Sequence, residues 1–225
     1  MKRFWREVTV EHGEVRLDDR PVRTPGRAPL VIPSPRLAAA IAEEWRAVEG
    51  TIDPRTMPLT GLANAAIDRI APDPAAFAAE LARYGESDLL YYRADSPAEL
   101  VARQHAAWDP LLDWARRRYD VHFEVTAGVI HRPQPEATVA RFAEAVAART
   151  AFELAGLSPV VTVTGSLIAA LALLEGAADA ETVWRAAQVD EAWQAERWGE
   201  DELAARARDA RRADFDAGAR FLALL

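Results

Sequence analysis

One short stretch of predicted helix combines carboxylates with tryptophan rings, a mixture suited to binding another protein. Its side chains of interest are Asp190, Glu191, Trp193, Glu196 and Trp198. Helical spacing places Glu191 between Trp184 and Trp198 on one stripe, because seven residues make nearly two turns. None of the three acids has a basic residue three or four positions away to compensate its charge. Exposed charge beside large amphipathic rings indicates a surface for a partner protein.

The same pattern also fits an ordinary amphipathic helix whose tryptophans face inward and whose acids meet water. On spacing alone this alternative is favoured. Neighbouring acids do have partners within reach: Glu181 can pair with Arg185, and both Glu200 and Asp201 can reach Arg197.

The sequence lacks the patterns of common catalytic and cofactor sites. It contains no G-x-x-x-x-G-K-[ST] or G-x-G-x-x-G phosphate loop and no G-x-S-x-G nucleophile turn. Ser166 lies inside a buried helical pattern, so we expect it to pack. The histidines show no metal-ligand spacing, and the absence of cysteine excludes disulfides and thiol chemistry. We therefore predict no cofactor, no metal site, no small-molecule substrate and no enzymatic activity.

The composition of the chain argues against nucleic acids and membranes as partners. The chain of 225 residues has a net charge of −8, which argues against general affinity for nucleic acid or anionic membranes. Half of the residues are hydrophobic and 28% are charged, as in globular proteins. The first ten residues lack the apolar core of a signal peptide. The apolar run over 157–174 is just long enough to raise a membrane span, but its polar residues and missing basic and aromatic flanks favour a buried central helix, so we predict no membrane insertion.

The N-terminal third alternates first like strands and then like helices. Short strands are expected at 4–10, 14–17, 20–22 and 29–32, forming a small β-meander. Ser34 and Pro35 form a good helix start, and that helix is expected to run to Gly50. Two further helices are expected over 59–70 and 75–84.

The pattern changes again at residues 85–87, which we take as a domain boundary. The segment 88–93 fits either a short extended segment or one turn of helix. A helix opening at Ser96-Pro97 is expected to be kinked or divided by Pro110 near Ala107. A strand is expected over 121–125, followed by helices over 137–149, 157–174, 179–198 and 201–222. The predicted fold is α+β: an N-terminal α+β domain (1–85) and a larger, mainly helical domain (86–225).

An ordered set of short phrases resembles one known family. The phrases are VRLDDRPV (15–22) with TP (24–25), AEEW (42–45), MPLT (57–60) with Asn64 and Asp68, DLLYYR (88–93), WDPLLDW (108–114), RY (118–119), and Gln194 with WG (198–199). Together they resemble the ATP synthase assembly chaperones that bind the alpha subunit of the soluble catalytic head, known from mitochondria and α-proteobacteria.

The resemblance implies a chaperone, without nucleotide or metal, that holds the new alpha subunit until beta replaces it. It implies the two-part fold predicted above and an important acid in the penultimate helix, which falls on Asp190 or Glu191 here. Mitochondrial members, which act in the matrix, carry a targeting extension; this chain begins at its first strand, so we expect an α-proteobacterial, cytoplasmic member. With the resemblance added, a partner-binding surface is favoured over an ordinary amphipathic helix as the interpretation of residues 188–201.

Two other classes of protein remain as alternatives. A carboxylate-dependent hydrolase could use acids such as Asp88 or Asp109, and would need a concave pocket with convergent titratable groups. A non-chaperone adaptor would bind the assembled complex, whereas a chaperone would bind free alpha subunit.

Overall fold

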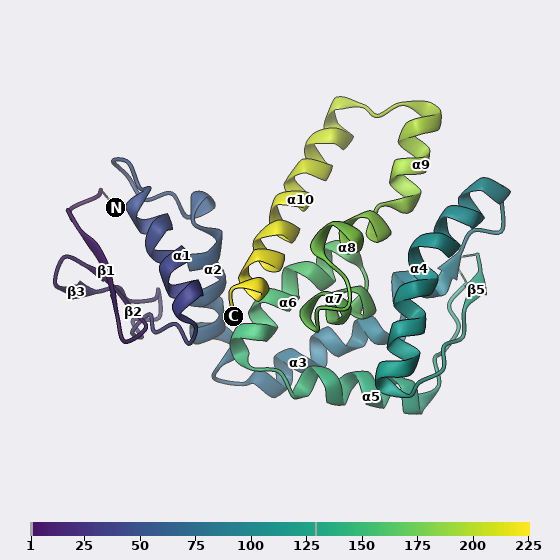
Figure 1. The fold of residues 1–225 in the computed structure, drawn as a ribbon, viewed down its shortest axis with the longest axis horizontal. Helices are drawn as coiled ribbons and strands as arrows, with labels where there is room; N and C mark the ends of the chain where they lie inside the picture. Colours follow the sequence, from purple (N-terminus) through teal and green to yellow (C-terminus); the bar gives the residue numbers. More distant parts are fainter. Residues whose placement is uncertain (1, 129) are drawn as a thin grey trace.

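The molecule consists of a small β-sheet and helix unit joined to a larger helical body (Figure 1). The structure is a computed structural model, and it describes residues 2–128 and 130–225. The predicted α+β fold, with a small N-terminal sheet and a mainly helical remainder, is confirmed.

The N-terminal sheet is an antiparallel meander of β1 (Val8–Glu11), β2 (Glu14–Leu17) and β3 (Arg20–Pro21). The β1–β2 turn places Gly13 at φ +82°, a conformation that glycine adopts without cost. Residues 29–32 add only single bridges, Glu14 to Val31 and Arg23 to Pro29, because prolines at 29 and 33 remove backbone donors.

Polar side chains join the first helices to each other and to the loop after the sheet. Helix α1 (Pro35–Arg46) begins at Ser34, whose Oγ accepts from the Leu37 N–H as predicted. It ends at Arg46, one turn before Gly50. The Glu44 carboxylate accepts from the backbone N–H groups of Leu59 and Thr60, both at 2.8 Å, at the start of α2 (Pro58–Ala65).

Helix α2 continues directly into the π-helical turn η2 (Ala66–Ile70). Asp68 in that turn accepts hydrogen bonds from the Thr24 hydroxyl at 2.6 Å and the Gly26 N–H at 2.8 Å. These contacts hold the loop after β3 onto the helices.

The helical body is formed by most of the remaining chain. Its elements are α3 (Pro74–Ala82), α4 (Ala98–Tyr119), α5 (Glu136–Ala147), α6 (Ala151–Thr164), α7 (Leu167–Leu174), α8 (Ala180–Ala187), α9 (Val189–Trp198) and α10 (Glu202–Ala223). Short 3₁₀ turns are η1 (Pro54–Thr56), η3 (Arg83–Glu86) and η4 (Leu89–Tyr91). The proposed boundary at 85–87 stays a prediction; α3, on its N-terminal side, packs against α5 and α6 (Figure 1).

Helices α6 and α10 cross at a pair of glycines. A Cβ built on Gly218 would lie 2.8 Å from the Gly156 carbonyl oxygen and 2.7 Å from Pro159 Cγ. Both helices are continuous there, so the absence of side chains lets their backbones approach closely. The C-terminal half of α10 is thereby fixed in the core, with Phe215 and Phe221 fully buried.

The apolar run over 157–174 is not one helix, contrary to the prediction. Helix α6 ends at Gly165, which has φ +66°, and Ser166 then accepts from the Ala169 N–H to begin α7. Ser166 is therefore a buried cap. No helix within the described residues is both long and apolar enough to cross a membrane.

Three further predictions around α4 need correction or completion. Helix α4 runs unbroken through Pro110, so the division expected near Ala107 does not occur. Residues 121–125 form no strand; instead β5 (Thr126–Ala127) pairs in parallel with β4 (Tyr92–Arg93). The undecided segment 88–93 combines both alternatives, a 3₁₀ turn followed by β4.

Candidate functional site

The predicted binding stretch lies in an arm formed by α9 and the first half of α10, which rises from the helical body beyond α8 (Figure 1). The prediction of one helix over 179–198 is wrong, because the helix is interrupted at Gln188, where α8 ends and α9 begins. The expected single stripe is therefore divided. Trp184 of α8 is buried against Phe215, with ring centroids 5.4 Å apart, while Trp198 of α9 is 73% exposed.

Helix α9 is attached to α4 by polar contacts that involve two of the three acids. Asp190 Oδ1 accepts from Gln104 Nε2 at 2.7 Å, and Gln104 Oε1 accepts from the Ala94 N–H at 2.8 Å. Glu196 pairs with Arg103 at 2.8 Å. These two acids lack partners within their own helix, as predicted, but find them across the interface with α4.

The two tryptophans of α9 lie in different environments. Trp193 is 8% exposed and meets Trp198 edge to face, with ring centroids 5.4 Å apart. The buried Trp193 ring therefore packs against one side of the Trp198 ring, and the rest of the Trp198 ring is exposed to solvent at the end of the arm. Leu203, in the first turn of α10, is 77% exposed on the other side of the 199–201 turn.

Trp198 and Leu203, the exposed apolar side chains on either side of the 199–201 turn, are called the apolar tip below; sequence reasoning missed Leu203. Its signal was an apolar residue with charged or small side chains at every helical neighbour position, Gly199, Glu200, Arg206 and Ala207. Such a residue has no large apolar neighbour within its own helix.

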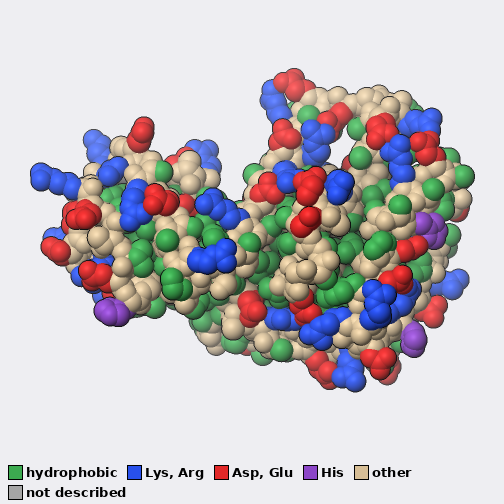
Figure 2. All heavy atoms as spheres, viewed as in Figure 1, with side chains coloured by type: hydrophobic (Ala, Val, Ile, Leu, Met, Phe, Trp, Pro, Cys, Tyr) green, Lys and Arg blue, Asp and Glu red, His purple; other side chains and the backbone are tan. Residues whose placement is uncertain are grey.

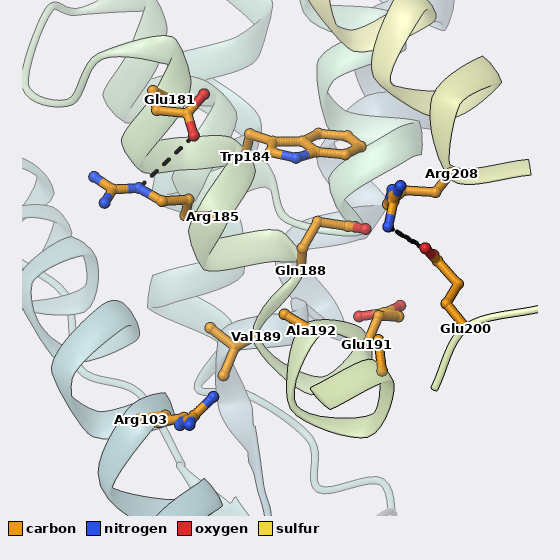
Figure 3. A pocket seen from close by; sticks show the side chains of 11 residues that line it. Arg103, Glu181, Trp184, Arg185, Gln188, Val189, Glu191, Ala192, Glu200 and Arg208 are labelled. Atoms are coloured by element: carbon orange, nitrogen blue, oxygen red, sulfur yellow. Dashed lines mark hydrogen bonds and ion pairs between the residues drawn. The ribbon is translucent and has the colours of Figure 1, made fainter. Parts of the chain in front are cut away.

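Glu191 is the acid of the stretch that stays free of internal pairing. It is exposed, and no described residue forms an ion pair or hydrogen bond with it. Its carboxylate points into a cavity of about 440 Å³ between α8, α9, α10 and α4 (Figure 3). On the visible face, acidic and basic side chains are mixed over this arm (Figure 2).

The pairs predicted beside the stretch are only partly confirmed. Glu181 pairs with Arg185 at 3.9 Å. The expected role of Arg197 is wrong, since it pairs with Glu99 of α4. Glu200 pairs instead with Arg208 at 2.5 Å, and Asp201 begins α10 by accepting from the Ala204 N–H.

The acids considered for a hydrolase are engaged in structural contacts. Asp88 is fully buried and accepts from the backbone N–H groups of Leu90 at 3.0 Å and Ile168 at 2.9 Å. Asp109 contacts Arg93 at 2.7 Å and His105 at 2.8 Å. Within the described residues, no group of histidines and acids is arranged to hold a metal ion.

The contribution of Asp88 to the free energy of unfolding should decrease as the pH rises. Burial raises its pKa from the ordinary 3.8 to about 6, although the N–H groups of Ile168 and Leu90 lower it. Because the folded-state pKa exceeds the unfolded one, the stabilisation is complete below 3.8 and is lost as pH rises through 6. Relative to Asp88→Asn, the wild type should lose about 2 kcal/mol of unfolding free energy between roughly pH 4 and pH 6. Urea unfolding of both proteins across this range measures the difference; a pH-independent difference would contradict the assignment.

Comparison with solved structures identifies the class of protein. A putative chaperone from Agrobacterium tumefaciens, Atu1473, superposes with a TM-score of 0.92 and 43% sequence identity, covering 99% of this chain and 85% of that one. Atp12 from Paracoccus denitrificans superposes with a TM-score of 0.93 and 45% identity, covering 99% and 97%. An aspartate-to-lysine mutant of the Paracoccus protein matches equally well. The fold is that of a chaperone.

The family follows from the sequence. The model of the ATP12 chaperone protein family matches residues 2–116. Mitochondrial atp12 of Schizosaccharomyces pombe is 25% identical over 214 residues, covering 88% of this chain and 74% of that protein. The chain belongs to the ATP12 chaperone family, which serves ATP synthase assembly, and the resemblance seen in the sequence is confirmed.

Proposed function

We propose that this protein binds the free alpha subunit of the ATP synthase catalytic head and prevents its aggregation until it pairs with beta. Membership of an ATP synthase assembly chaperone family supports the process, and the sequence resemblance implies the alpha subunit as client. The observation that carries the proposal is the pair of exposed apolar side chains on either side of the 199–201 turn, Trp198 and Leu203, together with the exposed Glu191, which has no ion-pair partner among the described residues.

The mechanism is protection of an interface before assembly. Subunits that assemble through large apolar interfaces expose those surfaces beforehand, and such surfaces aggregate. Trp198 and Leu203 supply apolar contact area, and Glu191 supplies a carboxylate for a basic group of the client. Of the five predicted client-binding residues, Glu191 and Trp198 make contact, while Asp190, Trp193 and Glu196 hold α9 in place.

Release requires that the complex with the chaperone be weaker than the final assembly. A tip built on a few side chains buries less area than an obligate subunit interface, which commonly exceeds about 2,000 Å². Beta can therefore displace the chaperone by burying more of the same apolar surface. No nucleotide is needed for this exchange, and we infer that the protein is a cytoplasmic binding protein rather than an enzyme.

Neither alternative class has comparable support. A hydrolase would need a reactive carboxylate open to substrate, but Asp88 is buried as a helix cap and Asp109 is held by Arg93 and His105. An adaptor would bind the assembled enzyme, where the apolar interfaces that suit the tip are already covered.

Affinity capture from cells that are synthesising ATP synthase tests the proposal. The tagged protein should recover alpha subunit in excess of beta, identified by mass spectrometry. The Glu191→Lys variant should recover much less alpha subunit, because the carboxylate that meets the client becomes a cation. The matched control is Glu144→Lys, an exposed acid of α5 whose one ion pair among the described residues is with Arg141; this variant should recover alpha subunit as the wild type does. Recovery of no alpha subunit, or of the complete catalytic head alone, would overturn the proposal.

A further inference from the structure

The cavity beside α9 contains a buried hydrogen-bond acceptor without a partner. Gln188 is only 7% exposed, and its Oε1 atom has no hydrogen-bond partner among the described residues. Figure 3 shows the Gln188 side chain extending into the cavity. Leaving a buried carbonyl oxygen without a hydrogen bond is unfavourable, so a site that keeps one suits a ligand that donates to it.

The orientation of the Gln188 amide follows from its neighbour. Gln188 Nε2 lies 3.4 Å from the Ala187 carbonyl oxygen, to which it donates. Turning the amide over would place two acceptor oxygens against each other. The group facing the cavity is therefore the acceptor.

Most charges around the cavity are already engaged. Arg185 pairs with Glu181, and Arg208 pairs with Glu200. On the α4 side, Arg103 pairs with Glu196. Glu191 has no such partner among the described residues, and its carboxylate faces the same cavity as Gln188 (Figure 3).

The remaining walls of the cavity are apolar. They are formed by Trp184, Val189, Ala192 and Ala195. The cavity thus combines apolar walls with two free acceptors, one neutral and one anionic. A complementary group has an apolar stem that ends in several N–H donors and a positive charge.

We propose that this cavity receives an arginine side chain of the partner protein, with its methylene stem along the apolar wall and its guanidinium donating to Gln188 Oε1 and the Glu191 carboxylate. The inference deepens the proposed function and rests on it. Arginine fits better than lysine because its planar fork can serve two acceptors at once. The volume of about 440 Å³ lies within the usual range for ligand pockets.

A titration with a small probe tests the cavity without the client. N-acetyl-arginine amide should shift the NMR signals of the Gln188 side-chain amide and the Glu191 backbone, with an affinity in roughly the millimolar range. N-acetyl-citrulline amide has the same shape without the charge and should shift them far less. Equal shifts with both probes, or none with either, would overturn the assignment.

A second experiment measures the binding of free alpha subunit. Glu191→Gln and Gln188→Leu should each weaken binding about tenfold, since the first removes the negative charge that faces the guanidinium and the second removes a hydrogen-bond acceptor. Glu181→Gln is the matched control, because Glu181 lines the same cavity but is paired with Arg185 and Arg212. Unchanged affinity of both cavity variants would refute the arginine site and the contact of Glu191 with the client, while binding of free alpha subunit through Trp198 and Leu203 would stand. A wild type that binds no alpha subunit would refute the proposed function, and the probe titration would then decide whether the cavity binds a guanidinium.

Discussion

Gly218→Ala should lower the free energy of unfolding by about 3 kcal/mol, because its new methyl group meets atoms that cannot move aside. The Gly156 carbonyl oxygen and the Pro159 ring lie at 2.8 and 2.7 Å from the new Cβ position, and both belong to helix α6. The two helices must separate, which disturbs the buried Phe215 and Phe221. The higher helix propensity of alanine offsets only about 1 kcal/mol of this cost.

Gly61→Ala is the matched control for this substitution. Gly61 lies within α2, and a Cβ built there has no atom within 4 Å. It should be neutral or stabilise the protein by up to about 1 kcal/mol. Chemical denaturation of the three proteins measures both effects; a Gly218→Ala variant as stable as wild type would show that the α6–α10 contact is not tight.

Replacing Trp198 and Leu203 together by serine should reduce affinity for free alpha subunit at least about 100-fold. Exposed aromatic side chains that become buried on binding commonly contribute about 2 kcal/mol or more each, and Leu203, on the other side of the 199–201 turn, adds apolar area. Because both side chains are more than 70% exposed, the free energy of unfolding should change little. Binding to immobilised alpha subunit, together with urea unfolding, separates the two quantities.

Ile130→Ser is the control for the apolar tip. Ile130 is 79% exposed on a different segment, so its substitution removes an exposed apolar side chain from outside the tip. It should leave affinity for alpha subunit unchanged. If it weakened binding as much as the double substitution, general surface hydrophobicity would account for binding and the tip would have no special role.

The elements predicted well from the sequence are those specified by local chemistry. The Ser34-Pro35 helix start, for example, uses side-chain capping, which neighbouring residues decide. The break at Gln188 was missed because no glycine or proline marks it. It depends instead on contacts distant in sequence: Trp184 packs on Phe215, and Asp190 binds Gln104.

The strand expected over 121–125 shows a similar limit. Val121 is buried, but within the described residues no strand pairs with residues 121–125. A hydrophobic alternation predicts which side chains face inward, whereas a strand also requires a neighbouring backbone to pair with. Here that pairing begins only at Thr126, against Tyr92.

The sequence predicted which stretch holds the candidate site. It could not predict which residues of that stretch are engaged in contacts with other helices and which remain free. Spacing correctly indicated that the acids lack partners in their own helix. It could not indicate that Arg103 and Gln104 of α4 would engage Glu196 and Asp190 and leave Glu191 free. The exposed Leu203 was missed because one apolar residue in a helix usually faces the core.

The central claim is that the protein holds free alpha subunit and yields it to beta, and displacement measures this directly. Labelled protein bound to alpha subunit should be released when beta is added, in proportion to the alpha–beta complex formed, and should not rebind the assembled head. A stable complex that retains the protein together with both alpha and beta, or equal affinity for free alpha subunit and for the assembled head, would contradict the account.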